Sequence, residues 1–167
     1  DPRVLDMSGP ARALLLNVVI LPFRPRRSAE QYEKIWTEEG SPLTIHTEAL
    51  AARVREILGD GYRVAYGMRY RNPPIRQGVD HLIAQGCDRI VVLPLFPQYA
   101  SASTGSALEE VFRVIGERWN LPDVVTVGAF YDEAGYLGAV AEVARPHLEA
   151  FQPDHVLVSY HGLPEKQ

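Results

Sequence analysis

The fold is decided by an apolar run in the middle of the chain, RIVVLPL at residues 89–95, and by the hydroxyl-rich stretch FPQYASASTGS that follows it at residues 96–106. The apolar run is short and rich in Val and Ile, which is typical of a buried strand. Similar runs recur along the chain, at residues 62–67, 124–128 and 155–159. Helical patterns separate them, at residues 73–86, 103–118 and 132–150. Apolar strands spaced by helices predict βαβ units and a parallel sheet that helices cover on both faces.

Residues 155–159 form the cleanest of these strand patterns, because His155 begins an apolar run that leads to His161 and a loop broken by Gly and Pro. Such a strand brings an imidazole to the rim of an α/β sheet, where ligands bind. Aromatic rings, Arg and hydroxyl groups follow the other predicted strands, at residues 68–74, 96–106 and 130–131. This chemistry suits a large, flat, partly apolar ligand with acidic substituents.

Two helix starts are expected in the first third of the chain. Ser28 has Gln31 three residues on, which is a capping-box pattern for a helix that runs through Trp36. Ser41 followed by Pro42 opens the next helix. Both patterns satisfy backbone N–H groups that the first turn of a helix leaves unpaired.

An apolar segment at residues 13–23 precedes these helices. It is too short to cross a bilayer, which needs roughly 20 residues. It runs directly into Arg24, Arg26 and Arg27. Two interpretations stay open: the segment packs in a core or an interface, or it forms a lip over an apolar pocket or on an anionic membrane surface.

The composition fits one domain over residues 1–167. The chain has 167 residues and 46% hydrophobic content, enough for one core, with a lip segment at about 10–27 and an α/β core at about 41–167. Its net charge of -4 gives no indication of nucleic acid as a partner. The single Cys87 forms no intrachain disulfide and lacks the paired spacing of a zinc site. A reducing compartment is therefore expected, and the cytoplasm is the predicted location.

The hydroxyl-rich loop before the helix at residues 103–118 allows two other interpretations. Ser101, Ser103, Thr104 and Ser106, with Gly105, would cradle a phosphate at a helix N-terminus, as the loop that holds the flavin phosphate does in flavodoxins. Alternatively, one of these hydroxyls simply caps the helix. A flavodoxin places such a loop after its first strand and has no need of the histidine at the end of the fourth, so the flavin interpretation is the weaker one.

Four motifs resemble the successive signatures of bacterial ferrochelatases. They are YEKIWTEEGSPL at residues 32–43, MRY at 68–70, LPLFPQYASASTGS at 93–106 and SYHGLP at 159–164. The resemblance implies insertion of ferrous iron into a dianionic porphyrin, protoporphyrin IX or coproporphyrin III, at the end of haem biosynthesis. It also implies a Rossmann-like, three-layer, chelatase-like domain of the α/β class, facing a second similar domain across a cleft.

The resemblance assigns roles to single residues. His161 matches the family's catalytic histidine, which accepts pyrrole protons or ligates the incoming iron. The residues that match segments lining the substrate cleft are Arg69, Tyr70, Tyr99, Ser101 and Thr104. The basic residues at 24–27 are loosely similar to the lip over which the porphyrin enters, so peripheral membrane contact is a further expectation. The partners implied are porphyrin and ferrous iron, both as substrates.

The chain also departs from the family pattern. Members open with an apolar strand and a Gly-containing turn, and they continue past the His161 motif into a second domain; neither is found here, so the fragment alone is expected to be inactive. Some members bind an iron–sulfur cluster through a cysteine where this chain has Ser101, so no cluster or other cofactor is expected in this half. Two alternatives are a sirohydrochlorin chelatase and a non-catalytic module that binds flavin or tetrapyrrole.

Overall fold

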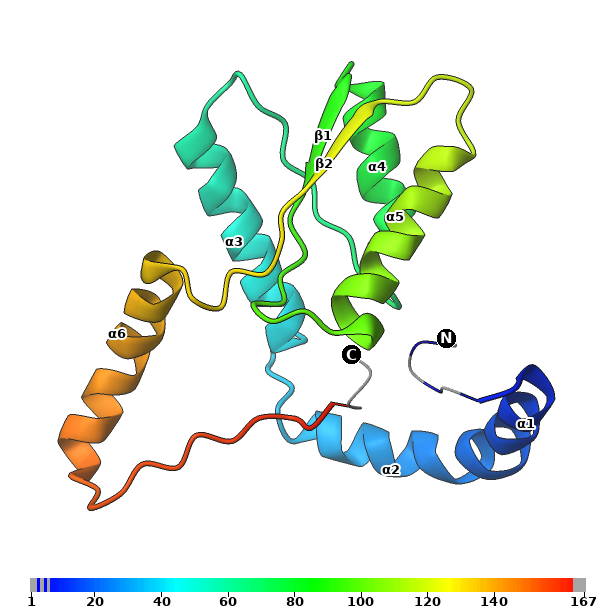
Figure 1. Ribbon diagram of the computed structural model, residues 1–167. Coiled ribbons are helices and arrows are strands. Elements are labelled where there is room, and N and C mark those ends of the chain that lie inside the picture. Colours follow the sequence, from blue (N-terminus) through cyan, green and yellow to red (C-terminus); the bar gives the residue numbers. More distant parts are fainter. Residues whose placement is uncertain (1–2, 4, 6, 164–167) are drawn as a thin grey trace.

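The computed structural model describes residues 3, 5 and 7–163, apart from the side chain of Arg27 (Figure 1). Pro164, the last residue of the final motif, lies outside this range. The elements in chain order are α1 (Gly9–Leu14), the π-helical η1 (Leu15–Ile20), α2 (Leu21–Glu33), α3 (Pro42–Leu58), α4 (Ile75–Ala84), β1 (Arg89–Val92), the π-helical η2 (Ser101–Gly105), α5 (Ser106–Gly116), β2 (Asp123–Thr126) and α6 (Ala134–Phe151).

Strands β1 and β2 form a parallel pair that α5 connects, which is the βαβ unit that the sequence predicts. Ile90 lies opposite Val124, and Val92 lies opposite Thr126. The small parallel sheet with its helices confirms an α/β, chelatase-like fold. Because parallel strands end at the same edge, the segments that follow β1 and β2 leave the sheet together.

The hydrophobic core lies between this sheet and the helices α4 and α5 (Figure 1). Helix α5 supplies Val111, Val114 and Ile115, whose spacing of three and four residues puts them on one face of a helix. Val114 is fully buried, and Ile90 of β1 is 4% exposed. The remaining core positions come from α4, whose buried residues are Ile75 and Val79. One helical layer therefore covers one face of the sheet.

The other face of the sheet is open, although a helical layer is expected on both faces. Val91 is 62% exposed and Val125 is 44% exposed. Within the described range, α6 has no buried residue and α3 has only Ala51. The accessible surface is 13073 Å², against about 8,200 Å² for a compact monomer of 18.6 kDa. Much apolar surface thus remains uncovered.

Two expected strands do not form. In the described part of the chain, residues 62–67 have no ladder partner, and a single bridge joins Met68 to Pro74 just after them. Residues 155–159 are not a strand either, and Leu157 within them is 93% exposed. A strand is stable only when a neighbour pairs with its backbone and something buries its apolar face. An alternating or apolar pattern is local and supplies neither.

The expected helix start at Ser28 is also wrong. Ser28 lies inside α2, which begins at Leu21 with Pro22 in its first turn, where the fixed φ of proline favours a helix. The second start is confirmed, since Ser41 has extended backbone and Pro42 is the first residue of α3. Ser41 makes no side-chain cap hydrogen bond there.

We expect Val114→Ala to lower the free energy of unfolding by about 2 kcal/mol, because it removes two buried methyl groups and leaves a cavity between α5 and the sheet. The matched control is Val143→Ala on α6, where the side chain is 72% exposed and the expected change is within about 0.5 kcal/mol. Urea unfolding monitored by circular dichroism measures both. Equal losses in the two variants would contradict the core assignment.

Candidate functional site

A groove of about 800 Å³ lies between the α2–α3 turn, the first turns of α3 and the loop that precedes α4. Its walls include Trp36, Ser41, Tyr70 and Arg71. The loop is tied to Ser106, which follows the segment that leaves β1. The groove is therefore adjacent to the carboxyl edge of the sheet, where ligands bind in open α/β folds.

The turn that forms one wall of the groove is closed by its own backbone. Thr37 N donates to Gly40 O at 3.0 Å, and Gly40 N donates to Thr37 O at 3.1 Å. Gly40 has φ +118°, a conformation that a residue with a Cβ rarely adopts. Ser41 and Pro42 then start α3, so the sequence EEGSP sets the direction in which the helix leaves the turn.

The loop at residues 68–74 forms the opposite wall, and it is closed by a tight backbone approach. Met68 N donates to Pro73 O at 2.7 Å, and Ile75 N donates to Met68 O at 3.3 Å. A Cβ on Gly67 would lie 2.6 Å from the Cα of Ile75, so only glycine fits there. This closure makes the loop project Arg69, Tyr70 and Arg71 from a fixed base.

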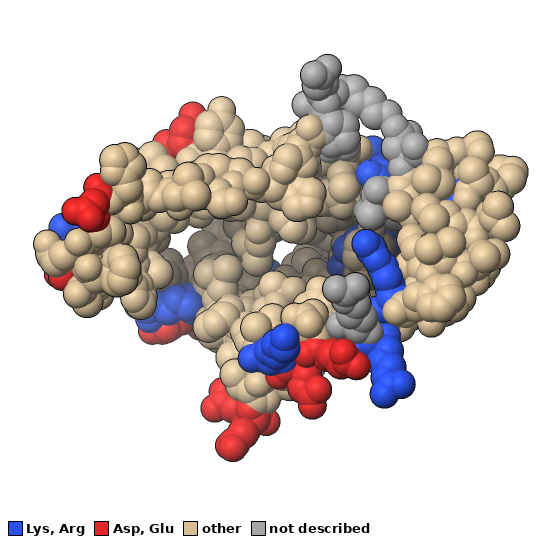
Figure 2. All heavy atoms as spheres, turned by 90° about the horizontal axis from the view of Figure 1, so that it is seen from below, with Lys and Arg blue, Asp and Glu red and all other residues tan. Residues whose placement is uncertain are grey.

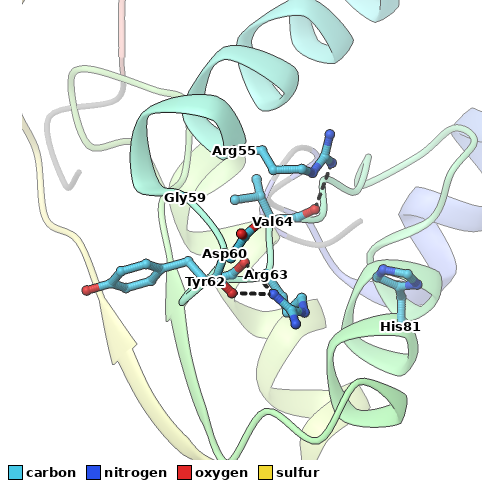
Figure 3. A pocket seen from close by; sticks show the side chains of 7 residues that line it. All are labelled: Arg55, Gly59, Asp60, Tyr62, Arg63, Val64 and His81. Carbon is cyan, nitrogen blue, oxygen red and sulfur yellow. Dashed lines mark hydrogen bonds between the residues drawn. The ribbon is translucent and has the colours of Figure 1, made fainter.

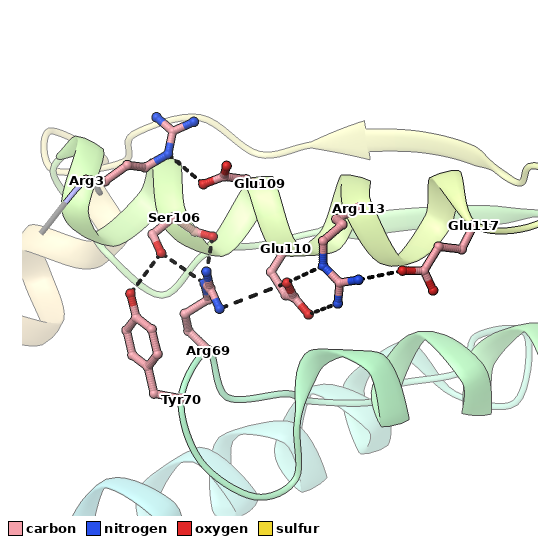
Figure 4. A network of polar contacts seen from close by, with 8 residues as sticks. All are labelled: Arg3, Arg69, Tyr70, Ser106, Glu109, Glu110, Arg113 and Glu117. Atoms are coloured by element: carbon pink, nitrogen blue, oxygen red, sulfur yellow. Dashed lines mark hydrogen bonds and ion pairs between the residues drawn. The ribbon is translucent and has the colours of Figure 1, made fainter. Parts of the chain in front are cut away.

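Arg69 and Tyr70 are attached to the start of α5 (Figure 4). The Nε of Arg69 donates to Ser106 O at 3.0 Å and to Ser106 Oγ at 2.9 Å. The Tyr70 hydroxyl lies 3.0 Å from the same Oγ. The Nη1 of Arg69 is 4.0 Å from Glu110 Oε2, and its guanidinium carbon lies 4.8 Å from the centre of the Tyr70 ring.

A row of ion pairs continues along the exposed side of α5 (Figure 4). Arg113 bonds Glu110 at 2.6 Å and Glu117 at 2.5 Å, and Arg76 bonds Glu117 at 2.6 Å. The hydrogen bond from Arg113 lowers the pKa of Glu110, and the one from Arg76 lowers the pKa of Glu117. Each carboxylate is therefore held in its ionised form beside its arginine.

The groove also contains a cation and a carboxylate of its own. The guanidinium of Arg71 lies 6.0 Å from the centre of the Trp36 ring. The Tyr66 hydroxyl donates to Glu48 at 2.5 Å, and this bond raises the pKa of Tyr66. Aromatic faces next to a guanidinium are able to hold a flat ring through stacking and an acidic substituent through a charged hydrogen bond.

The structure brings the predicted loop at residues 99–106 next to Arg69 and Tyr70, but only part of it reaches the surface. Tyr99 is 54% exposed, and its hydroxyl packs close to Gly105. Ser101 Oγ accepts a hydrogen bond from Arg3 at 3.4 Å. Thr104 is 7% exposed, and in the part of the chain that the structure describes its Oγ1 has no hydrogen-bond partner. Contact between Thr104 and a ligand stays a prediction, and it requires this loop to open.

The phosphate-cradle and helix-cap interpretations both lose their support here. Ser103 Oγ donates to Ala100 O at 3.4 Å, and Ser106 is fully buried. Among the residues that the structure describes, no side chain caps the N-terminus of α5. Thr104 and Ser106 are buried and are therefore not open to an anion.

His161 is not joined to this group. It lies in the exposed segment after α6, where its Nδ1 is 2.7 Å from the carbonyl oxygen of the neighbouring Gly162. Its catalytic and metal-binding roles stay predictions. The same range contains no group of three or more His, Cys, Asp and Glu side chains arranged to hold a metal ion.

A second hollow, of about 290 Å³, lies where α3 ends (Figure 3). Arg55 donates to Val64 O at 3.0 Å, and Arg63 donates to Asp60 O at 2.7 Å. His81 of α4 faces these residues across the hollow. Arg55, near the end of α3, lines this hollow, whereas Thr44 and Glu48, near its start, line the groove, so the two are separate features along one helix.

Sequence reasoning missed Glu110, considered Ser106 only as a phosphate ligand or helix cap, and gave Trp36 and Arg71 no individual role although both lie in segments that it singled out. Ser106 and Glu110 are four residues apart, so they share a face of α5, but nothing local indicates that Arg69 meets that face. The Arg-Tyr-Arg run that ends at Arg71 could have indicated this site. With two arginines in one short loop, the protein can hold one of them while the other faces a ligand.

Parallel strands joined by a helix, with a groove beside the loops that follow them, define the class of α/β proteins that bind ligands at the carboxyl edge of a sheet. A family model described as Ferrochelatase matches residues 1–167, so this chain belongs to the ferrochelatase family.

Similar curated proteins carry the same name. The chain is 43% identical over 166 residues to a ferrochelatase of Coxiella burnetii (strain RSA 493 / Nine Mile phase I), covering 99% of the chain and 46% of that protein. It is 45% identical over 169 residues to one of Azoarcus sp. (strain BH72), covering 98% and 46%, and 40% identical over 166 residues to one of Legionella pneumophila (strain Corby), covering 99% and 49%. The chain thus spans about half the length of these relatives. No solved structure matches it significantly.

In the range that the structure describes, every helix is too short or too polar to cross a bilayer.

The ion pairs of α5 predict a defined dependence of stability on pH. In the folded chain the pKa of Glu110 lies below its usual 4.5. The ionised carboxylate therefore stabilises the fold above about pH 4.5. This stabilisation is lost as the pH falls through the lowered pKa. We expect Glu110→Gln to lower the urea midpoint of unfolding at pH 7. The difference in midpoint between the variant and the wild type should disappear below pH 4.5. Glu142→Gln on α6 is the control, and a gap that stays constant down to pH 3 would count against the pairing.

Proposed function

We propose that this chain supplies the porphyrin-binding half of a ferrochelatase, which inserts ferrous iron into protoporphyrin IX or coproporphyrin III. The observation that carries the proposal is the groove of about 800 Å³, with Tyr70, Arg71 and Trp36 in its walls, next to the loops that leave the sheet. This volume lies within the usual range for small-molecule sites. Membership of the ferrochelatase family supports the substrate class.

The groove chemistry matches a porphyrin dicarboxylate. Tyr70 is 63% exposed and Trp36 is 45% exposed, so both rings have area to offer to a flat apolar ligand. Arg71 is exposed beside them, and a guanidinium binds a carboxylate through two parallel hydrogen bonds. In this assignment the rings hold the macrocycle while Arg71 holds an acidic substituent.

Metal insertion requires two pyrrole protons to leave while a hydrated dication loses its waters. A planar ring shields its nitrogens from both events, so packing that bends the ring exposes a lone pair, with remote contacts supplying the binding energy. A proton acceptor with an ordinary pKa near the working pH is suited to the first event, and the value for histidine in general is about 6.5. Neutral imidazole also ligates ferrous iron.

We assign the proton-accepting or iron-ligating role to His161, as the sequence motif implies. Its exposed ring supports this assignment, because an imidazole with access to solvent is free to meet a ligand. The segment at residues 152–163 carries the ring, and the proposal requires this segment to dock near the groove in the complete enzyme. Since the relatives are about twice as long as this chain, we assign the opposite wall of the site, and hence turnover, to residues outside it. The expectation of no iron–sulfur cluster in this half rests on Ser101.

Peripheral membrane contact is proposed for the helical segment from α1 to α2. Leu14 is 66% exposed, Val18 is 56% exposed and Phe23 is 74% exposed, with Arg24 and Arg26 directly after them. Seen from below, the α1 end of the molecule is almost wholly uncharged, and basic side chains lie beside it (Figure 2). An exposed apolar face with flanking arginines favours the surface of an anionic bilayer or the lip of an apolar site.

Anaerobic incubation with a porphyrin dicarboxylate and ferrous or zinc ions tests the main proposal, with the loss of free-base absorption as the measurement. We expect turnover from a form extended to the length of the relatives and none from this chain alone. His161→Ala in the extended form should reduce the rate at least about 100-fold, the usual contribution of a general base. His147→Ala on α6 is the matched control. Equal rates from the extended form and this chain, or from His161→Ala and the wild type, would overturn the mechanism.

Co-sedimentation with vesicles of phosphatidylcholine and phosphatidylserine tests the membrane proposal. We expect Phe23→Ser to weaken binding about tenfold, because one buried aromatic side chain is lost from the bilayer surface. Phe151→Ser at the end of α6, where Phe151 is 81% exposed, is the control and should bind like the wild type. Binding that ignores both the substitution and the phosphatidylserine content would refute the contact.

A further inference from the structure

Ser106 combines complete burial with three polar contacts to one loop. Its side chain is fully buried at the first position of α5. Its Oγ lies 2.9 Å from Arg69 Nε and 3.0 Å from the Tyr70 hydroxyl, and its carbonyl oxygen accepts from the same Nε at 3.0 Å. A hydroxyl has one proton and two lone pairs, so Ser106 is able to serve both partners at once.

These contacts fix two side chains that differ in exposure (Figure 4). The Arg69 side chain is only 27% exposed, and it is held at Nε by Ser106 and approached at Nη1 by Glu110. Tyr70 is 63% exposed, with its hydroxyl held by Ser106 and its ring next to the Arg69 guanidinium. The tether at the hydroxyl leaves the Tyr70 side chain exposed at the groove that it lines, while Arg69 is held by protein acceptors.

Glu110 completes this arrangement without touching the groove. Its side chain is 18% exposed, and it also bonds Arg113 at 2.6 Å. The Arg113 hydrogen bond lowers the pKa of Glu110, so a negative charge stays near Arg69 at neutral pH. The guanidinium thus has a hydrogen-bond acceptor at Nε and an anion near Nη1, which together restrict its rotamer.

We infer that Ser106 is a positioning residue for the ligand groove: it orients Tyr70 directly, through the hydroxyl, and also by way of Arg69. This inference rests on the proposed porphyrin-binding function and extends it to a residue that never touches the ligand. It also changes the role of Arg69 from a ligand for substrate carboxylates to a support for Tyr70. A side chain held in its binding conformation loses less rotamer freedom when the ligand arrives, which strengthens binding.

The test is a double-mutant cycle on porphyrin affinity in the full chain. The probe is protoporphyrin IX, and its binding is followed by quenching of tryptophan fluorescence and by the shift of its main absorption band. We expect Ser106→Ala and Tyr70→Phe each to weaken binding about tenfold, equivalent to one hydrogen bond to a charged or ordered group. The double variant should bind no more weakly than Ser106→Ala alone, because that change already removes the contact that Tyr70→Phe removes.

The controls separate a positioning role from a general loss of structure. Ser8→Ala at the start of α1, where no side-chain cap bond is made, should leave affinity unchanged. Tyr70→Phe keeps the ring and alters an exposed position, so it decides the matter even where Ser106→Ala does not fold. Tight binding by Tyr70→Phe, or additive losses in the double variant, would overturn the inference while the proposed function stands. An absence of porphyrin binding by the wild-type chain would instead overturn the proposed function.

Discussion

The packing of α5 against β1 and β2 is the contact on which the rest of this structure depends. Its apolar face supplies Val111, Val114 and Ile115 to the core, and its first residue, Ser106, holds the loop that forms one wall of the groove. A shift of α5 along the sheet would therefore move the core and the groove together. The site is precise because it is attached to the best-packed helix in the described part of the chain.

Arginine chemistry extends this arrangement beyond the core. The chain has 17 basic residues, of which only Lys34 and Lys166 are lysines, and its arginines pair repeatedly with the acids of α5. Surface ion pairs add little stability one at a time, but a connected row fixes side-chain directions. The same row restrains Arg69, whereas Arg71, the other arginine of the loop that lines the groove, lies beside Trp36.

Several surfaces of this ferrochelatase family member are apolar and open. One face of the sheet, the helices from α1 to α2 and the segment after α6 all expose large apolar side chains, and Val91 and Leu157 are examples. Apolar surface of this extent is typical of interfaces. Curated relatives are about twice as long as this chain. This length agrees with the proposal that residues outside the chain complete the site.

The sequence by itself determined the local elements: the strands β1 and β2, the helices from α3 to α6, and the shared edge at which β1 and β2 end. Each follows from hydrophobic spacing, proline at a helix start, or the rule that parallel strands end at one edge. Only the tertiary structure decided that residues 62–67 and 155–159 stay unpaired and that Ser28 lies inside α2. It also decided that Ser106 joins Arg69 to Tyr70. Strand pairing and buried hydrogen bonds join residues far apart in the chain, and no local pattern encodes the partner.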